Sequence, residues 1–529
     1  MGLCAPSPMP ETTSSVRQVA VLDMGASAIR LVIGEIPPKK KDVRVIEEMS
    51  RGVALGRDAF SSSGVIRAAT VDNAIAALAG FREVIDGYGI TDIRAVATSA
   101  VREARNGDMF LDRIRGRTGI EFEIINEAEE SRLMHLAVRK ELSRHSAFKG
   151  AWTLLAEVGG GSTDLTMLRH GEPNRSGVYA LGAIRMRQQL DLKRHSRDLQ
   201  LSLLRRYIAN VIEEIRVEVP LKRVTHMIAI GGDVRFVASQ VLEKEQADGY
   251  RDISREDFLA FCDQVERMDE EALVDRFRLS AVQAETLVPS LLIYRTLLEE
   301  TASKQVVVSD ASLRTGVLLD LAEPGGRLGA EDFEAQVWAS ADAVGRKYRY
   351  DQAHGRHVAG LSASLFDQLI DEHQLTRRER LLLEVSALLH DIGTYVNLRA
   401  HHKHSQYLLS ASQIFGLSDD ETSIVANIAR YHRRGTPQQS HLSYIALDRQ
   451  DRLIVNKLAS ILRVANALDA EHQQKVRAVR LVKRDQAWVL EIEGTGDVTM
   501  EQMVATARVD MFVETFGRQV VVRQAGVSE

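Results

Sequence analysis

The sequence predicts an α/β protein made of two similar lobes, followed by an all-α domain and a small α/β domain. Two matching segments predict the lobes, because each runs from an apolar strand through a carboxylate and a glycine turn into a second strand. A change to helical spacing after about residue 322 predicts the all-α domain. At 529 residues the chain is too long for one hydrophobic core, which also favours several domains.

The two matching segments predict a phosphate-binding cleft. The first has Asp23 before Gly25, and the second has Glu157 before a run of three glycines that starts at Gly159. Glycine lets backbone N–H groups approach a phosphate closely. A carboxylate can hold Mg²⁺ or position a water molecule. One such turn is a weak signal, but a pair favours two lobes that face each other across the cleft.

The expected parts follow from the spacing of apolar residues and from turn-forming residues. They are a disordered tail over 1–17, lobe I over 18–142, lobe II over 143–322, a helical domain over 323–473 and an α/β domain over 474–529. The clearest linker is the Pro-Gly-Gly run from Pro324 to Gly326.

Individual elements are expected within these parts. Strands are predicted over 43–48, 93–98, 227–230, 476–482, 488–492 and 519–522. Helices are predicted over 70–88, 197–218 and 500–512.

Composition excludes several classes of protein. Apolar residues at 45% and charged residues at 27% are typical of soluble proteins. No apolar run approaches the ~18 residues of a membrane span. The first fifteen residues lack the apolar core of a secretion signal. Cys4 and Cys262 are the only cysteines, so we expect no disulfide framework and a cytoplasmic location.

The net charge of −5 argues against nonspecific binding of nucleic acid, which normally needs a basic excess. A polyanionic ligand would therefore need a local basic surface. Candidates are the lysine run from Lys39 to Lys41 and the pair Arg433 and Arg434, although solvated charged loops are the simpler interpretation of both.

Two further polar clusters lie between the glycine turns. Residues 97–107 follow a predicted strand and open a helix, a geometry that offers N–H groups and Arg102 to an anion. Residues 124–133 place Glu127, Glu129 and Glu130 at the start of another helix. Carboxylates there can serve the chemistry, or they can simply favour the positive end of the helix dipole.

Seven short elements occur in order along the first two lobes. They are Asp23 to Gly25 with Arg30, residues 97–107, Glu129 with Glu130, Gly159 to Thr163, Leu181 to Arg185, Gly231 with Gly232, and residues 308–316. In type and spacing they resemble the exopolyphosphatase/guanosine-pentaphosphate phosphatase family, which has two actin-like (ribonuclease H-like) lobes. The helical region resembles the C-terminal HD-type domain of the same family.

The resemblance implies a metal-dependent hydrolase that releases terminal phosphate from inorganic polyphosphate, with guanosine pentaphosphate or tetraphosphate as further partners. It implies Mg²⁺ as cofactor, no membrane or nucleic-acid partner and a homodimer. Glu130 matches the general base, and Glu157 matches a residue that binds metal and positions water. The implied metal ligands in the lobes are Asp23, Glu157 and Asp164. The implied phosphate-binding residues are Gly25, Ser27, Arg30, Arg102, Gly159, Gly160, Gly161, Ser162, Gly231, Gly232 and Arg314.

Several positions depart from the family pattern. A Ser-Asn-Ser run is usual after the first glycine turn, but this chain has Ala26, Ser27 and Ala28. Glu157 replaces an aspartate and Asp164 replaces a glutamate, and these two changes of length can compensate. Asp233 stands where threonine is common, and the glycine usual before the Glu-Glu pair is replaced by the run from Asn126 to Ala128. These departures leave a second hypothesis open, a polyphosphate- or alarmone-binding regulator with weak catalysis.

Ten of the fifteen histidines lie between His354 and His472, a clustering that suggests a metal or anion site. Within the resemblance, His357, His390, Asp391 and Asp469 have the residue types and order of a divalent metal site. The alternative is that the domain only contacts substrate and forms the dimer. His401, His402, His404 and His432 are then structural residues or anion contacts.

Overall fold

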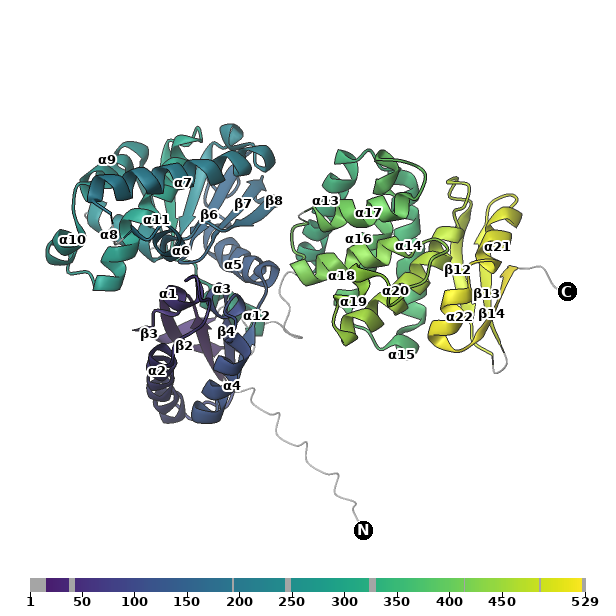
Figure 1. The fold of residues 1–529 in the computed structure, drawn as a ribbon, viewed down its shortest axis with the longest axis horizontal. Helices are drawn as coiled ribbons and strands as arrows, with labels where there is room; N and C mark the ends of the chain where they lie inside the picture. The colour runs from purple at the N-terminus through teal and green to yellow at the C-terminus, as the bar shows by residue number, and fades with distance from the viewer. Residues whose placement is uncertain are drawn as a thin grey trace, which may run out of the picture. The chain divides into compact units, whose positions relative to one another are not determined.

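The computed structural model describes residues 16–37, 43–192, 195–242, 249–322, 330–412, 414–484 and 487–525 (Figure 1). The chain divides into two compact units, Met1–Ala330 and Glu331–Glu529. Residues 1–15 of the predicted tail, the lysine run at 39–41 and the linker at 324–326 lie outside the described residues.

The first sheet of unit 1 has five strands in the order β3-β2-β1-β4-β5. They are β1 (Arg17–Met24), β2 (Ala28–Ile36), β3 (Arg44–Gly52), β4 (Ile93–Ala97) and β5 (Phe122–Ile124). β1, β2 and β3 pair antiparallel, while β4 is parallel to β1 and β5 is parallel to β4. The first glycine turn joins β1 to β2, so Asp23 lies at the end of a central strand.

The second sheet repeats this plan in the order β10-β11-β9-β6-β7-β8. Its strands are β6 (Thr153–Val158), β7 (Thr163–Arg169), β8 (Glu172–Tyr179), β9 (His226–Ile230), β10 (Tyr250–Ser254) and β11 (Gln305–Ser309). Read from the other end, the strands β8-β7-β6-β9-β11 match β3-β2-β1-β4-β5 of the first sheet. In both sheets the first three strands pair antiparallel and the last two continue in parallel. The predicted duplication of the lobe is therefore confirmed.

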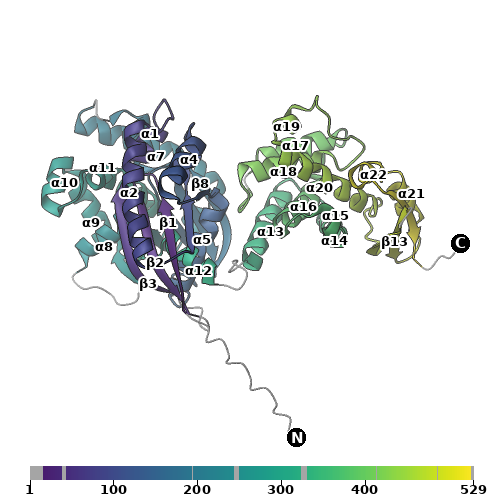
Figure 2. The same cartoon turned by 90° about the horizontal axis from the view of Figure 1, so that it is seen from below.

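The alternation of side chains in β1 shows how the helices pack. Ala20 and Leu22 face a core shared with α2 (Ala68–Gly87) and α4 (Gly107–Thr118). Val19 and Val21 face the opposite way, into a core that also contains residues of the second sheet. Two helices, α5 (Glu127–Leu142) and α12 (Leu313–Ala322), supply that shared core and lie between the two sheets. Figure 2 shows α2 and α4 on one side of the first sheet and α5 and α12 on the other.

The outer face of the second sheet is covered by α7 (Arg197–Glu218), α8 (Gly232–Val241), α9 (Arg255–Glu266) and α11 (Ala281–Glu299). The remaining helices of unit 1 are α1 (Leu55–Ala59), α3 (Ser99–Arg102), α6 (Ala183–Gln189), η2 (Leu221–Arg223) and α10 (Glu270–Phe277).

Unit 2 begins with helices. They are α13 (Ala330–Lys347), α14 (Gln352–Gln368), α15 (Ile370–His373), α16 (Arg377–Leu389), η3 (Ile392–Tyr395), α17 (His401–Ser410), α18 (Asp419–Arg430), α19 (Leu442–Ile445) and α20 (Arg449–Ala467). A sheet of β12 (Val476–Val482), β13 (Ala487–Gly494) and β14 (Gln519–Gln524) follows, with β13 antiparallel to β12 and parallel to β14. The change to helices and the return to strands were both predicted.

Two sequence predictions need correction. The single helix expected over 500–512 is two helices, α21 (Thr499–Thr506) and α22 (Asp510–Phe516), because the chain turns to bury Met511 and Phe512. β1 starts at Arg17, so the last residue of the predicted tail belongs to the sheet. In the part of the chain that the structure describes, no helix is long and apolar enough to cross a membrane.

Candidate active site

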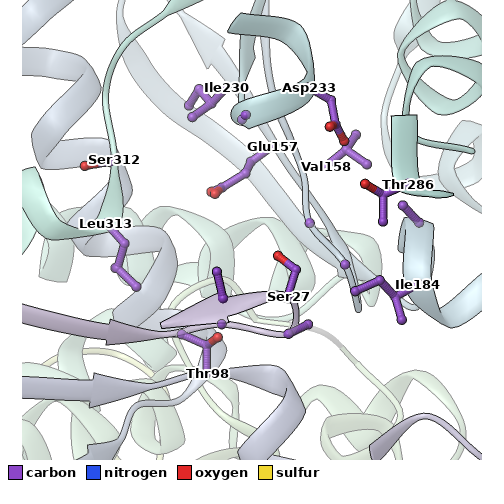
Figure 3. A pocket seen from close by; sticks show the side chains of 18 of the residues that line it. Ser27, Thr98, Glu157, Val158, Ile184, Ile230, Asp233, Thr286, Ser312 and Leu313 are labelled. Carbon is purple, nitrogen blue, oxygen red and sulfur yellow. The ribbon is translucent and has the colours of Figure 1, made fainter. Parts of the chain in front are cut away.

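A cavity of about 550 Å³ lies between the two lobes of unit 1, where the glycine turns meet. Figure 3 shows Glu157 pointing into it from the second sheet and Ser27 from the first turn on the opposite side. The predicted site residues that line it are Asp23, Gly25, Ser27, Arg30, Glu130, Glu157, Gly159, Gly160, Ser162, Asp164, Gly231, Gly232 and Arg314. The structure thus brings these predicted residues together, and three glycine turns with a set of carboxylates and arginines line the cavity.

The two glycine turns touch each other. A Cβ atom on Gly160 would lie 2.9 Å from the Cβ of Ala26, and one on Gly161 would lie 2.4 Å from the ring of Phe60. Neither distance leaves room for a side chain, so glycine at both positions lets the second turn pack against lobe I. Gly161 is not among the described residues that line the cavity, and its place in the structure indicates a packing role.

Arg185, from the predicted Leu181–Arg185 element, holds the lobes together beside the turns. Its guanidinium carbon lies 4.3 Å from the centre of the Phe60 ring, and its Nη2 lies 2.6 Å from Glu103 Oε1 of lobe I. Its Nε also donates to the carbonyl oxygen of Gly161. One side chain thus links the second turn to the ring and the carboxylate of the other lobe.

Glu129 and the predicted general base Glu130 are neighbours in α5 but face different surroundings. Glu129 pairs with Arg132 at 2.8 Å, and Arg132 also pairs with Asp320 of α12 at 2.9 Å. Glu130 lines the cavity, with its Oε2 3.6 Å from Nη1 of Arg102. The structure therefore gives Glu129 a packing role between α5 and α12 and leaves Glu130 available for chemistry.

Four carboxyl groups of the cavity have raised pKa values, those of Glu130, Glu157, Asp164 and Asp233. Burial is the main cause for each, raising the pKa of Glu130 to about 7, that of Glu157 to about 8 and that of Asp164 to about 6. Mutual repulsion adds to the effect, because Glu130, Asp164 and Asp23 all raise the pKa of Glu157. Ser131 donates a hydrogen bond to Asp164 and opposes its shift. Such a cluster favours protons or a cation at its centre.

The first carboxylate, Asp23, is held by two arginines. Its Oδ2 lies 3.1 Å from Nη1 of Arg314 and 3.4 Å from Nη1 of Arg30, and Arg314 also donates to Glu48. The predicted phosphate-binding arginines thus converge on the predicted metal ligand. A phosphate that entered here would meet both guanidinium groups close to the carboxylate cluster.

Arg102, like Gly161, was predicted to bind phosphate, but its surroundings suggest a different role. Its Nη1 donates to the carbonyl oxygen of Ile125 at 2.8 Å, and Nη2 lies 3.4 Å from Glu127. It is not among the described residues that line the cavity. These contacts fit an arginine that positions the start of α5, and with it Glu130.

Arg235 lines the cavity but was missed in the sequence. It lies in the first turn of α8, after Gly231 and Gly232, and its Nη1 lies 3.4 Å from the carbonyl oxygen of Ala311. Burial lowers its pKa, while Glu157 acts in the opposite direction. An arginine soon after a glycine turn is the signal that could have identified it. Asp233 of the same helix also lines the cavity, and burial raises its pKa.

The raised pKa of Glu157 predicts how stability depends on pH. Its carboxyl group binds a proton more tightly in the folded protein, about 8 against an ordinary 4.5, so metal-free protein should lose stability as pH rises through this range. We expect Glu157→Gln in EDTA to melt a few degrees above the natural protein at pH 8, and at about the same temperature at pH 4.5.

Thermal melts at both pH values measure this difference, with Asp112→Asn as control because that carboxylate is exposed. Mg²⁺ should raise the melting temperature of the natural protein at pH 8 and have a smaller effect on the variant. An equal gap between the two proteins at both pH values would show that Glu157 does not carry the shift.

Unit 2 contains the other predicted metal ligands. His390 and Asp391 lie together at the end of α16, and Asp469 lies 2.8 Å from Nδ1 of His354. Nε2 of His357 is buried without a hydrogen-bond partner, and His357 is not in the groups of converging ligands found among the described residues. The structure thus brings His354 to the cluster in the place that the sequence had given to His357.

The sequence matches the Ppx/GppA phosphatase family over residues 32–324 and the Ppx/GppA phosphatase domain III over residues 338–503. It is 24% identical to a guanosine-5'-triphosphate,3'-diphosphate pyrophosphatase of Vibrio campbellii over 460 residues, 84% of this chain and 86% of that protein. It is 29% identical to exopolyphosphatase 1 of Mycobacterium leprae over 177 residues, 32% of this chain and 49% of that protein.

A solved structure supports the fold. The crystal structure of an exopolyphosphatase from Cytophaga hutchinsonii is similar with a TM-score of 0.52 at 21% identity, over 58% of this chain and 98% of that one. This likeness agrees with the paired sheets of an actin-like fold. The family match covers more than half of the chain and includes most of the cavity residues. The chain therefore belongs to the Ppx/GppA phosphatase family.

Proposed function

We propose that this protein hydrolyses the terminal phosphoanhydride bond of inorganic polyphosphate, and that guanosine pentaphosphate is a further substrate. The observation that carries the proposal is the position of Glu130 in a cavity that also holds the carboxylates of Glu157 and Asp164 and the three glycine turns. The names of the similar proteins support these substrates, because they include both a pyrophosphatase of a guanosine nucleotide and an exopolyphosphatase.

In this proposal Glu130 is the general base. Its carboxylate accepts a proton from a water molecule as the water oxygen attacks the terminal phosphorus atom. The bond from phosphorus to the bridging oxygen breaks, and the shortened chain leaves with that oxygen. Arg30, Arg314 and Arg235 line the cavity and would bind the charged phosphate oxygens, while N–H groups of the glycine turns orient them.

The proposed cofactor is Mg²⁺. The donor set fits, because the negatively charged groups among the described lining residues are all carboxylates, and their mutual repulsion favours a cation. Asp23, Glu157 and Asp164 are the residues that would hold it. A bound Mg²⁺ neutralises phosphate charge and stabilises the transition state. Repulsion among the carboxylates also makes them bind protons more tightly, and these protons compete with the metal. Mg²⁺ binding should therefore strengthen as pH rises.

Phosphate release from long-chain polyphosphate and from guanosine pentaphosphate, each with Mg²⁺ and with EDTA, tests this function. We expect Mg²⁺-dependent release from at least one of the two. Tight binding of both without measurable release would instead favour the regulator. That alternative rests on the altered first turn, where Ala26 and Ala28 lack hydroxyl groups, and on the carboxylate of Asp233.

Residues 1–330 are expected to hydrolyse short polyphosphates as the full chain does. All the described residues that line the cavity belong to unit 1, and α12, which ends at Ala322, is retained. We expect the KM for long chains to rise, because a long polyanion gains from many weak contacts that unit 2 would supply.

Kinetics on short and long chains, with the full chain and with residues 1–330, measure this. A folded but inactive 1–330 protein would place essential chemistry in unit 2.

We further propose that the helices of unit 2 form an HD-type domain and that the protein is a cytoplasmic homodimer. The buried free thiol of Cys262 is consistent with a reducing compartment, and analytical ultracentrifugation tests the dimer.

A further inference from the structure

Unit 2 contains a second cluster of metal-binding side chains, well apart in the sequence from the cavity residues. His354 lies in α14, His390 and Asp391 follow α16, His401 begins α17 and His432 follows α18. Among the described residues, two groups of three have ligand atoms within 4.8 Å of one another. The groups are His354 with His390 and Asp391, and Asp391 with His401 and His432.

Asp391 belongs to both groups and turns one oxygen to each. Its Oδ2 lies 3.5 Å from Nε2 of His390 and 4.0 Å from Nε2 of His354. Its Oδ1 lies 3.0 Å from Nε2 of His401 and 3.3 Å from Nε2 of His432. Oδ1 is buried and makes no hydrogen bond. A carboxylate placed in this way can bridge two cations.

Contacts on the far side of each imidazole ring fix its orientation. Nδ1 faces a backbone carbonyl oxygen in three of the rings, so it must carry the proton and Nε2 must present a lone pair. The Nδ1 to oxygen distances are 2.7 Å from His390 to Ala387, 2.6 Å from His432 to Ala429 and 3.0 Å from His401 to Leu398. In His354, Nδ1 faces a carboxylate oxygen instead, Oδ2 of Asp469, at 2.8 Å.

The lone pairs then face each other. Nε2 of His354 lies 3.3 Å from Nε2 of His390, and Nε2 of His401 lies 3.1 Å from Nε2 of His432. Two neutral rings in this arrangement repel, and either a cation or an extra proton relieves the repulsion.

Two glycines let the backbone bring these ligands together. A Cβ atom on Gly355, beside His354, would lie 2.6 Å from the carbonyl oxygen of Leu388. One on Gly393, after Asp391, would lie 2.1 Å from the carbonyl oxygen of His401. Ala400 precedes His401 with a φ of 59°, a left-handed conformation that is unfavourable for alanine. The backbone thus accepts close contacts and local strain at the cluster, as functional sites often do.

We propose that unit 2 binds two divalent first-row transition-metal ions bridged by Asp391. His354 and His390 are ligands of one ion, and His401 and His432 are ligands of the other. Asp469 is a positioning residue that orients His354. Imidazole ligands favour such metals over Mg²⁺, so this centre differs in chemistry from the carboxylate cavity of unit 1. It does not depend on the proposed function, because every ligand belongs to unit 2.

Equilibrium dialysis of the full chain against Co²⁺, with metal analysis and visible absorption spectra, tests the proposal. Glu157→Gln serves as the background and Mg²⁺ is present in excess, so that the unit 1 cavity does not contribute. We expect two Co²⁺ ions per chain. Asp391→Ala should lose both, and His354→Ala and His401→Ala should each lose one. His404→Ala is the matched control, because His404 lies in α17 outside the cluster, and it should retain two.

Co²⁺ content no higher in the background protein than in Asp391→Ala would overturn the proposal, since protons would then occupy the cluster. One ion per chain would overturn the two-ion centre. If an alanine variant does not fold, glutamine at the same position replaces it. The number of Co²⁺ ions bound per chain in the Glu157→Gln background, where the cluster is unchanged, decides the question without any variant of the cluster.

Discussion

Glu130→Gln is expected to lower kcat for polyphosphate by roughly 10²–10⁴-fold, the usual contribution of a general base. The amide keeps the shape of the side chain but cannot accept the proton of the attacking water. KM should change little, because the arginines and glycine turns that bind phosphate are untouched. Initial rates of phosphate release across a range of substrate concentrations separate kcat from KM.

Glu129→Gln provides a matched control one residue away. Glu129 pairs with Arg132 and does not line the cavity, so this variant should lose some thermal stability and keep most of its kcat. If instead Glu130→Gln kept more than about half of the activity while Glu129→Gln lost it, the base would have to be reassigned.

Glu157→Ala is expected to abolish Mg²⁺-dependent turnover. The side chain is at the centre of the repelling carboxylates, and its removal leaves Asp23 and Asp164 as the proposed ligands. Glu157→Asp should remain active, because it keeps the carboxylate that would hold the metal. Phosphate release measured over a series of Mg²⁺ concentrations distinguishes a lost metal site from a weakened one.

Two other results would change the interpretation of Glu157. Normal hydrolysis by Glu157→Ala would remove its metal role and strengthen the regulator hypothesis. A large increase in rate for Glu157→Asp would indicate that the longer side chain limits the natural protein. Binding of polyphosphate to Glu157→Ala, measured separately, shows whether any lost activity comes from catalysis or from a damaged cavity.

The sequence alone determined the arrangement of unit 1 to a large extent. Asp23 and Glu157 each follow an apolar strand and precede a glycine turn, and that pattern was enough to predict two similar lobes whose turns meet at a cavity. Strand and turn signals are local, so they can be read from consecutive residues. The predicted helix over 500–512 failed for the opposite reason. No proline or glycine marks the bend, and the burial of Met511 and Phe512, with Phe512 against Trp488 of β13, explains it.

Tertiary structure decided which of several neighbouring side chains face the cavity or join the histidine cluster. Only the family resemblance separated Glu130 from Glu129 in the sequence. Adjacent helical residues point about 100° apart, and in the structure Glu129 faces Arg132 while Glu130 faces the cavity. His354 and His357 lie three residues apart in α14. The close approach of helices at Gly355 brings His354 to His390 and Asp391. Residues distant in sequence set these choices, since each depends on what packs against the helix.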